Sequence, residues 1–175
     1  MIFMETSRLI LRNVQPKDME ILYRYRNQEA CIRFQRGQVR GREELRELIQ
    51  NRSRDRISLE KPCFLCVALR ETDEMAGEIL LMPSEETFSL GYTFAPEQQG
   101  RGYACEALSA LLTELHNRWP DWDSICFTEP ENLPSRRLLE RLGYEDLGYL
   151  PSRTSQVYGK WLRPDTSAEI ENAVR

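Results

Sequence analysis

Hydrophobic positions along the chain follow two periods, one typical of strands and one typical of helices. Short apolar runs between turn residues predict strands at 8–12, 64–69, 76–82, 87–94, 124–128, 144–149 and 156–162. Apolar residues at three- and four-residue spacing predict helices at 16–27, 42–54, 103–117 and 134–142. The order of these elements predicts an α/β fold (α+β type), in which a mixed sheet is covered by helices.

The same pattern predicts how the chain is organised. One domain is expected over residues 1–163, followed by a polar tail over 164–175 with a weak helical period at its end. Residues 28–40 show no period and are expected to form an irregular loop. This loop and the position just after it are rich in arginine, at Arg33, Arg36, Arg40 and Arg42. Such a run is typical of a solvated surface, and it also suits a ligand that carries carboxylates or phosphates.

Composition and charge exclude several classes of protein. The formal net charge is −4, whereas a nucleic-acid-binding domain is usually basic. No apolar run approaches the ~20 residues needed to span a bilayer, and residues 1–12 do not resemble a signal peptide. Five scattered cysteines fit reduced thiols, which predicts a cytoplasmic protein. Cys63 and Cys66 fall in a predicted strand and should point to opposite faces, so no metal site is expected.

The most informative segment joins the strand at 87–94 to the helix that begins at Tyr103. It contains Gly100 and Gly102, which let the backbone approach a bulky ligand without a side chain in the way. The first N–H groups of a helix have no partner inside that helix, and the helix dipole adds positive charge there. We therefore expect a phosphorylated ligand at residues 99–104.

Two common phosphate-binding motifs fit this corner poorly. A P-loop has Lys and then Ser or Thr after its second glycine, whereas Tyr103 and Ala104 stand here. A dinucleotide fingerprint has a third Gly or Ala where this chain has Cys105, and it needs a longer βαβ context.

A third motif fits well. Residues 91–107 resemble the main motif of the GNAT-type N-acetyltransferases, in which Gln99, Gly102 and Ala104 fill the pattern Gln/Arg-x-x-Gly-x-Gly/Ala. Residues 132–144, from Asn132 through Leu142-Gly143-Tyr144, resemble a second family segment. Residues 6–12 are similar to the opening of the branch that acetylates ribosomal-protein N-termini. The resemblance covers roughly residues 5–162.

This resemblance implies a GNAT-like fold with a splayed central sheet, and acetyl-CoA as cosubstrate without a metal. It implies a cofactor site in which backbone groups hold the pyrophosphate and the pantetheine arm, and Asn132 fixes that arm. The implied cofactor-binding residues are Phe94, Ala95, Gln99, Gly100, Arg101, Gly102, Tyr103, Ala104 and Asn132.

The implied catalytic residues are less regular. Many relatives place a tyrosine as proton donor seven residues after the asparagine, where this chain has Leu139. Ser135 is the candidate donor to the leaving thiolate, or else a first-turn hydroxyl that satisfies a backbone amide. Residues 87–95 contain no acid, so the candidates for the general base are Glu78, Tyr92 and a water relayed to a backbone carbonyl.

These features predict an acetyl-CoA-dependent N-acetyltransferase that acts on a primary amine, either a protein N-terminus or a small amine. The two N-terminal helices and the 28–40 loop are expected to line the acceptor site. A coenzyme-A-binding sensor or interaction module without activity stays open, as does a transferase of another acyl group such as succinyl. No nucleic-acid or membrane partner is expected. A homodimer paired through residues 144–149 or 156–162 stays open.

Overall fold

The computed structural model describes residues 1–175 and is organised around one sheet of eight strands in the order β1-β2-β3-β4-β5-β6-β8-β7. The strands are β1 (Ile2–Glu5), β2 (Leu9–Arg12), β3 (Cys63–Leu69), β4 (Met75–Ser84), β5 (Thr87–Phe94), β6 (Asp123–Thr128), β7 (Glu145–Leu150) and β8 (Ser155–Lys160). The helices are α1 (Met19–Arg26), α2 (Glu29–Ile32), α3 (Arg42–Arg52), α4 (Tyr103–Arg118), α5 (Leu133–Arg141) and α6 (Pro164–Ala173). Short 3₁₀ turns lie at η1 (Pro16–Asp18), η2 (Pro96–Gln98) and η3 (Pro151–Arg153). The predicted mixed sheet with covering helices is confirmed.

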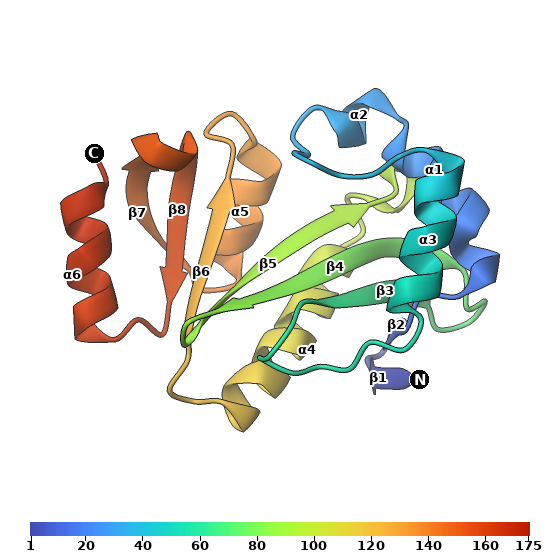
Figure 1. Cartoon of the computed structure of the whole chain (residues 1–175), viewed down its shortest axis with the longest axis horizontal. Helices are drawn as coiled ribbons and strands as arrows, with labels where there is room; N and C mark the ends of the chain where they lie inside the picture. The colour runs from blue at the N-terminus through green and yellow to red at the C-terminus, as the bar shows by residue number, and fades with distance from the viewer.

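The sheet opens between β5 and β6, its only parallel neighbours. Their register covers only Thr87 with Asp123 and Phe88 with Ser124, and beyond these pairs the two strands diverge (Figure 1). Every other neighbouring pair is antiparallel, and the β4–β5 ladder runs unbroken from Gly77–Phe94 to Ser84–Thr87. The splay that the family resemblance implied is therefore present.

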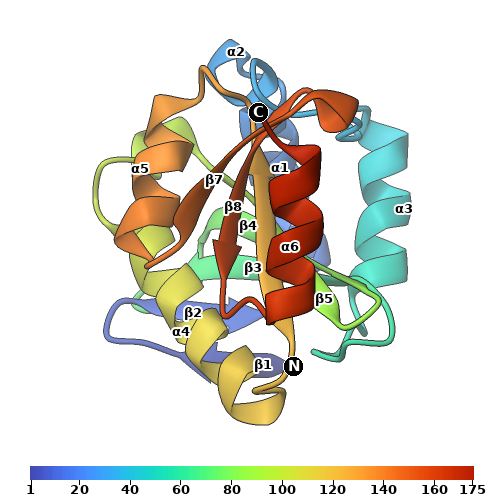
Figure 2. The same cartoon turned by 90° about the vertical axis from the view of Figure 1, so that its left-hand side faces the viewer.

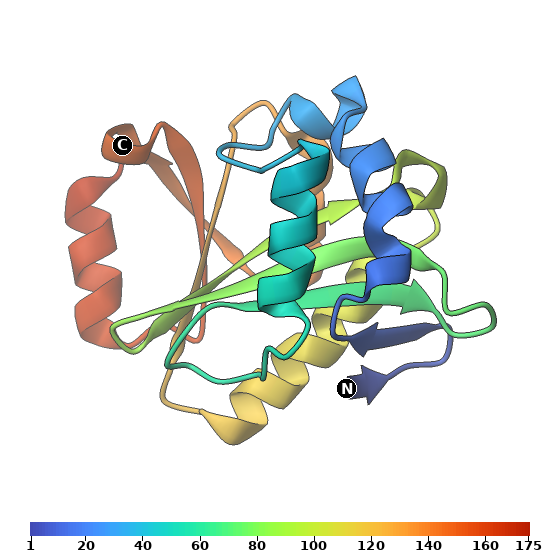
Figure 3. The ribbon, with the colours of Figure 1, turned by 45° about the vertical axis from the view of Figure 1, so that its right-hand side comes forward.

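Helices cover both faces of the sheet. Figure 3 shows α1 and α3 crossing one face over β3, β4 and β5, and Figure 2 shows α4 and α5 on the opposite side. Each face has its own apolar core, the larger one built on α4 and the smaller one on α1 and α3. Cys63 belongs to the larger core and Cys66 to the smaller one, so the prediction that they point to opposite faces is confirmed.

Two elements lay outside the sequence-based prediction, and the expected tail is helical over more residues than its weak period indicated. The edge strand β1 is only four residues long, and the four-residue α2 sits inside the segment expected to be irregular. Such short segments cannot display a period, because a period needs several repeats to be seen. The expected polar tail forms α6, whose N-terminal end is anchored where Asp123 accepts hydrogen bonds from Arg163 N (2.8 Å) and Nε (3.2 Å).

The two strands considered for dimer pairing differ in their free edges. β8 lies between β6 and β7, so both of its edges are already paired within the chain. β7 is an edge strand, but Tyr149 exchanges two backbone hydrogen bonds with Arg175, at 3.1 and 2.9 Å. The C-terminal residue thus covers part of the edge that a second subunit would use.

None of the helices is both long enough and apolar enough to cross a membrane.

Candidate functional site

The glycine corner has the backbone geometry that its sequence requires. Gly100 and Gly102 have φ values of +72° and +80°, in the left-handed region that side-chain-bearing residues rarely adopt. Gly102 directly precedes α4. None of the backbone N–H groups of residues 100–105 donates a hydrogen bond within the protein. This row of free donors at a helix N-terminus is a site for an anion.

The N-terminal segment holds this corner in place through Glu106, in the first turn of α4. The Glu106 carboxylate accepts hydrogen bonds from Thr6 Oγ1 (2.6 Å), Arg8 N (3.0 Å) and Arg8 Nε (2.7 Å). Arg8 Nη1 also donates to the carbonyl oxygen of Arg101 at 2.9 Å. Partial burial alone would raise the pKa of Glu106, but the hydrogen bonds from Thr6 and Arg8 outweigh it and lower that pKa. The glycine loop is thus tied to the first residues of the chain.

A cavity of about 520 Å³, named here the corner cavity, opens in front of these free N–H groups. The corner contributes Gly100, Gly102, Tyr103 and Ala104 to its lining. Its far wall comes from the start and outer face of α5, at Asn132, Pro134, Ser135, Leu138 and Arg141. The cavity therefore combines free amides and an arginine with an apolar wall.

The open edge of β5 borders the corner cavity. The carbonyl oxygen of Tyr92 accepts from Gln35 Nε2 at 3.2 Å, and that of Phe94 accepts from Gln99 Nε2 at 2.9 Å. Because β6 does not pair with this part of β5, side-chain amides bond to these two carbonyl oxygens instead. Ala95 lies differently, because its N–H donates to Ala76 and its carbonyl accepts from Gln98. Of the two residues predicted to hold the pantetheine arm, only Phe94 faces the opening.

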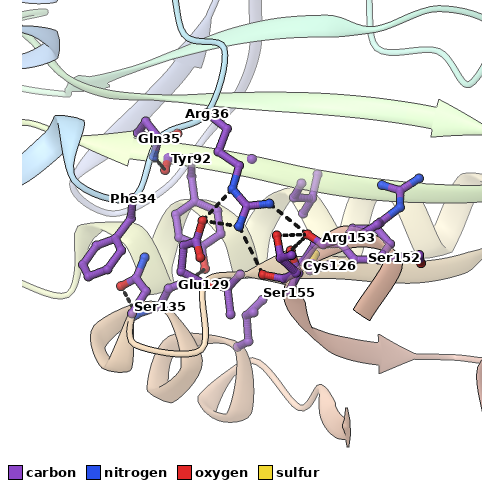
Figure 4. A pocket seen from close by; sticks show the side chains of 17 residues that line it. Phe34, Gln35, Arg36, Tyr92, Cys126, Glu129, Ser135, Ser152, Arg153 and Ser155 are labelled. Carbon is purple, nitrogen blue, oxygen red and sulfur yellow. Dashed lines mark hydrogen bonds and ion pairs between the residues drawn. The ribbon is translucent and has the colours of Figure 1, made fainter. Parts of the chain in front are cut away.

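A second cavity of about 540 Å³, named here the splay cavity, lies where β5 and β6 diverge (Figure 4). Arg36 crosses this opening from the loop after α2. It forms an ion pair with Glu129 and donates to the carbonyl oxygens of Arg153 (2.9 Å) and Thr154 (3.1 Å). Glu129 is the one carboxylate in the lining, and the remaining polar groups are mainly hydroxyls and amides. The cavity is thus closed on one side by a side chain that joins the two halves of the split sheet.

The two cavities meet at residues that line both of them, namely Phe34, Gln35, Tyr92, Asn132 and Ser135. The hydroxyl oxygens of Tyr92 and Ser135 are 2.8 Å apart, within hydrogen-bond distance. Asn132 caps α5 by accepting from Ser135 N at 3.2 Å. The helix cap is therefore supplied by Asn132, and the hydroxyl of Ser135 is left for other partners.

The remaining candidates for catalysis lie away from this point. Leu139 is an apolar core residue that borders the splay cavity and offers no proton. Glu78 is only 5% exposed and lines neither cavity. Its carboxylate accepts from Arg26 Nη2 (2.6 Å), Gln38 Nε2 (2.8 Å) and the hydroxyl of Tyr25. A role for Glu78 as general base stays a prediction, and this buried ion pair favours a structural role.

The arginines of the 28–42 region do not form one patch. Arg36 bridges the splay, whereas Arg42 pairs with Glu20 and stacks over Tyr23 on the outer surface of α1 and α3. Arg101 is exposed and donates to the carbonyl oxygen of Glu97 through Nε, at 3.2 Å. Arg101 contributes its backbone, rather than its side chain, to the corner.

Neither Glu129 nor Gln35 belongs to a motif that points to the site. Glu129 directly follows β6 and precedes the α5 cap by three residues, a strand-end position where functional side chains often lie. That signal is visible in the sequence. The contact between Gln35 and β5 has no such signal, because it joins segments 57 residues apart.

A family model described as "Acetyltransferase (GNAT) domain" matches residues 8–145, which is most of the chain. The chain belongs to the GNAT acetyltransferase family. This GNAT protein is 28% identical over 146 residues to YnaD of Bacillus subtilis (strain 168), described as an uncharacterized N-acetyltransferase. The match covers 82% of this chain and 83% of YnaD. The resemblance inferred from the motifs is confirmed.

Solved structures share the fold of this GNAT protein at low sequence identity. A GNAT-family acetyltransferase from Bacillus anthracis superposes with a TM-score of 0.76 at 23% identity, covering 91% of this chain and 96% of that one. RimL, a ribosomal-protein alpha-N acetyltransferase solved with coenzyme A, has a TM-score of 0.75 at 18% identity, with coverages of 91% and 97%. The microcin self-immunity acetyltransferase MccE, solved with acetyl-CoA and AMP, has a TM-score of 0.76 at 19% identity, with coverages of 89% and 93%.

Proposed function

We propose that this GNAT protein transfers the acetyl group of acetyl-CoA directly to a primary amine. The observation that carries the proposal is the meeting of two separate cavities at one hydroxyl pair, Tyr92 and Ser135. A transferase that works without a covalent intermediate must bring donor and acceptor to the same point from different sides. The corner cavity suits the donor, and the splay cavity suits the acceptor.

The donor set of the corner cavity fits acetyl-CoA. Free N–H groups of residues 100–105 can hold the pyrophosphate, and Arg141 adds a cation in the same cavity. The open edge of β5 borders this cavity at Phe94, where the pantetheine arm would pair as an added strand and take the place of the Gln99 amide on the Phe94 carbonyl. Asn132 lines the same cavity, and its side-chain oxygen caps α5, so its amide N–H groups are available as donors to the pantetheine arm. Two proteins of the same fold were solved with coenzyme A or acetyl-CoA bound.

Ser135 is the residue assigned to the leaving group. A neutral amine attacks the thioester carbonyl, the new C–N bond forms, the C–S bond breaks and the electron pair stays on sulfur. A hydroxyl beside that sulfur stabilises the developing thiolate by donating a hydrogen bond. Ser135 lies where the two cavities meet, and its hydroxyl is not used as a helix cap.

The splay cavity offers polar and aromatic surface to an amine acceptor. Glu129 is its one carboxylate, and Arg36 fixes the orientation of that carboxylate. Phe34, Tyr92 and Phe127 supply aromatic surface in the same cavity. A protein N-terminus or a small primary amine fits this combination of aromatic surface, hydroxyls and an ion-paired carboxylate.

The test is an acetyl-CoA turnover assay with a panel of peptide N-termini and small primary amines, in which the release of the free thiol of coenzyme A is measured. We expect turnover with at least one amine, and a binding isotherm for acetyl-CoA by calorimetry. Binding without turnover on any amine would instead support a coenzyme-A-binding module. A parallel assay with succinyl-CoA tests the acyl group, and a preference for succinyl-CoA would contradict acetyl transfer.

A further inference from the structure

We propose that Tyr92 is a positioning residue, which orients the Ser135 hydroxyl so that its proton faces the sulfur leaving acetyl-CoA. This inference rests on the proposed function and adds a residue to it. Tyr92 comes from the splayed strand β5, and Ser135 comes from the first turn of α5 across the opening. Their hydroxyl oxygens lie 2.8 Å apart, at the point where the two cavities meet.

The hydrogen-bond inventory allows either hydroxyl to donate, and the greater acidity of a phenol than of a serine hydroxyl favours Tyr92 as the donor. A serine hydroxyl has one proton and two lone pairs, and a phenol likewise has one proton to give. Tyr92 has no other side-chain partner, and Ser135 Oγ makes no hydrogen bond to a backbone carbonyl. With Tyr92 as donor and Ser135 as acceptor, the proton of Ser135 stays free for a third group. In the proposed reaction, that third group is the sulfur of acetyl-CoA bound where the two cavities meet.

The surroundings of Tyr92 keep its hydroxyl protonated, so that it can donate a hydrogen bond. Burial raises the pKa of Tyr92 well above its ordinary value. The phenol therefore keeps its proton throughout the neutral pH range. Tyr92 does not give this proton away in the reaction, because a buried phenolate would be strongly disfavoured.

Because Leu139 carries no hydroxyl, α5 cannot supply a hydrogen-bond partner for Ser135, and β5 supplies one. Leu139 lies one helical turn beyond Ser135 on α5, with its side chain in the core and at the border of the splay cavity. α5 therefore presents no hydroxyl other than Ser135 to the place where the cavities meet. The second hydroxyl at this point comes from β5.

The reaction balances without further groups. The amine nitrogen bonds to the carbonyl carbon, coenzyme A leaves as a thiolate, and the extra proton of the new amide is released to solvent. Ser135 donates a hydrogen bond to the thiolate and keeps its own proton. Tyr92 holds Ser135 in the rotamer that allows this, so its effect should depend entirely on Ser135.

A double-mutant cycle tests this dependence, with kcat measured on the amine that gives turnover. Ser135→Ala should lower kcat about 100-fold and Tyr92→Phe about 10-fold, the range expected for one preorganised donor and its support. Tyr92→Phe added to Ser135→Ala should lower kcat no further, since the hydroxyl that Tyr92 positions is then absent. The dissociation constant for acetyl-CoA, measured by calorimetry, should change less than twofold in all three.

The matched control is Tyr158→Phe. Tyr158 also bonds to α5 through its hydroxyl, which accepts from Arg136 Nε at 2.9 Å, but it lines neither cavity. Its kcat should equal that of the unmodified enzyme. If Tyr92→Phe lowers the thermal midpoint, fluorotyrosine can be placed at position 92 instead. It keeps the shape of the tyrosine side chain and makes its hydroxyl a stronger hydrogen-bond donor. This replacement should change kcat when Ser135 is present, and it should leave kcat unchanged in the Ser135→Ala background.

Three results would overturn the proposal. Unchanged kcat in Tyr92→Phe would mean that the hydroxyl of Tyr92 has no role. Multiplied losses in the double variant would mean that Tyr92 acts independently of Ser135. Absence of turnover by the unmodified enzyme on every amine would overturn the proposed function itself, and this inference with it.

Discussion

The corner cavity and the splay cavity share a wall, but different parts of the chain build them. In the corner cavity the anion site is backbone, made of consecutive N–H groups and two glycines with positive φ between β5 and α4. In the splay cavity most polar groups are side chains, and Arg36 bonds to the Glu129 carboxylate and to the backbone carbonyl of Thr154, which lie 93 and 118 residues away along the chain. One site depends on a local sequence, and the other depends on how distant segments pack.

A sequence pattern can reveal the first kind of site but not the second. A backbone site needs particular residues at fixed spacing, because glycine alone adopts the required φ without strain. A side-chain site needs only that a few charges meet, and many sequences can bring that about. Substitutions should therefore act locally in the corner cavity and across the split sheet in the splay cavity.

The largest expected effect concerns a residue that belongs to neither cavity. Glu78→Ala leaves the guanidinium of Arg26 buried without its partner, which should lower the free energy of unfolding by about 3–5 kcal/mol. Urea unfolding at pH 7 measures this, with the exposed Glu74→Ala as the control. A marked loss of kcat in Glu78→Gln, with stability kept, would instead return Glu78 to the role of general base.

The next largest effect should fall on the corner alone. Gly102→Val places a β-branched side chain at φ +80°, so the free N–H groups lose their alignment and acetyl-CoA affinity should fall about 100-fold. Calorimetry measures this change. Gly37→Val is the matched control, because Gly37 also has a positive φ (+67°), with no atom within 4 Å of an added Cβ. Equal losses of affinity in both variants would contradict a local anion site.

A smaller effect, on amine binding alone, should distinguish the role of the splay cavity from that of the corner cavity. Arg36→Gln removes the cation that orients Glu129, so KM for the amine should rise about 10-fold while acetyl-CoA affinity stays the same. Steady-state kinetics with each substrate varied in turn measures both. Arg42→Gln, which breaks an exposed pair with Glu20, is the control. A fall in KM would show that Arg36 competes with the amine for Glu129.

The smallest effect tests how the corner is tied to the N-terminal strand. The pKa of Glu106 is lowered in the folded protein, so its stabilising contribution is present above its ordinary value of 4.5 and is lost as the pH falls through the folded value. Glu106→Gln should lower the free energy of unfolding by about 1 kcal/mol at pH 7. This gap from the unmodified protein should shrink below about pH 4.5.

Urea unfolding at several pH values measures that gap. Glu114→Gln is the control, since Glu114 lies on the same helix and makes only an exposed pair with Arg118. A gap for Glu106→Gln that does not depend on pH would mean that the hydrogen bonds to Glu106 do not favour its ionised form.

Much of the fold followed from periodicity alone. The strand over 87–94 and the helix that starts at Tyr103 agree with the structure because both carry several repeats of their pattern. β1 and α2 escaped prediction because each has only four residues. Their positions depend on pairing with β2 and packing beside α1, which are contacts that the local pattern does not encode.

The candidate site divided in the same way. Gly100, Gly102 and Asn132 could be named from their motifs, and the structure places all three in the lining of the corner cavity. Glu78 was selected because it lies on a strand next to the corner strand, and the sequence did not reveal that Arg26 neutralises it. Two contacts join segments that no spacing rule connects, namely Gln35 with Tyr92 and Arg36 with Glu129.

The family, the mixed sheet and the anion corner can be inferred from local sequence, because each depends on residue types at short and fixed spacing. The separation of β5 and β6 after Phe88, and the contact of Tyr92 with Ser135 across the opening, depend on long-range packing. So does the pairing of the C-terminal residue with β7. The physical reason is that these contacts depend on packing and sheet twist summed over the whole domain, which no local pattern records.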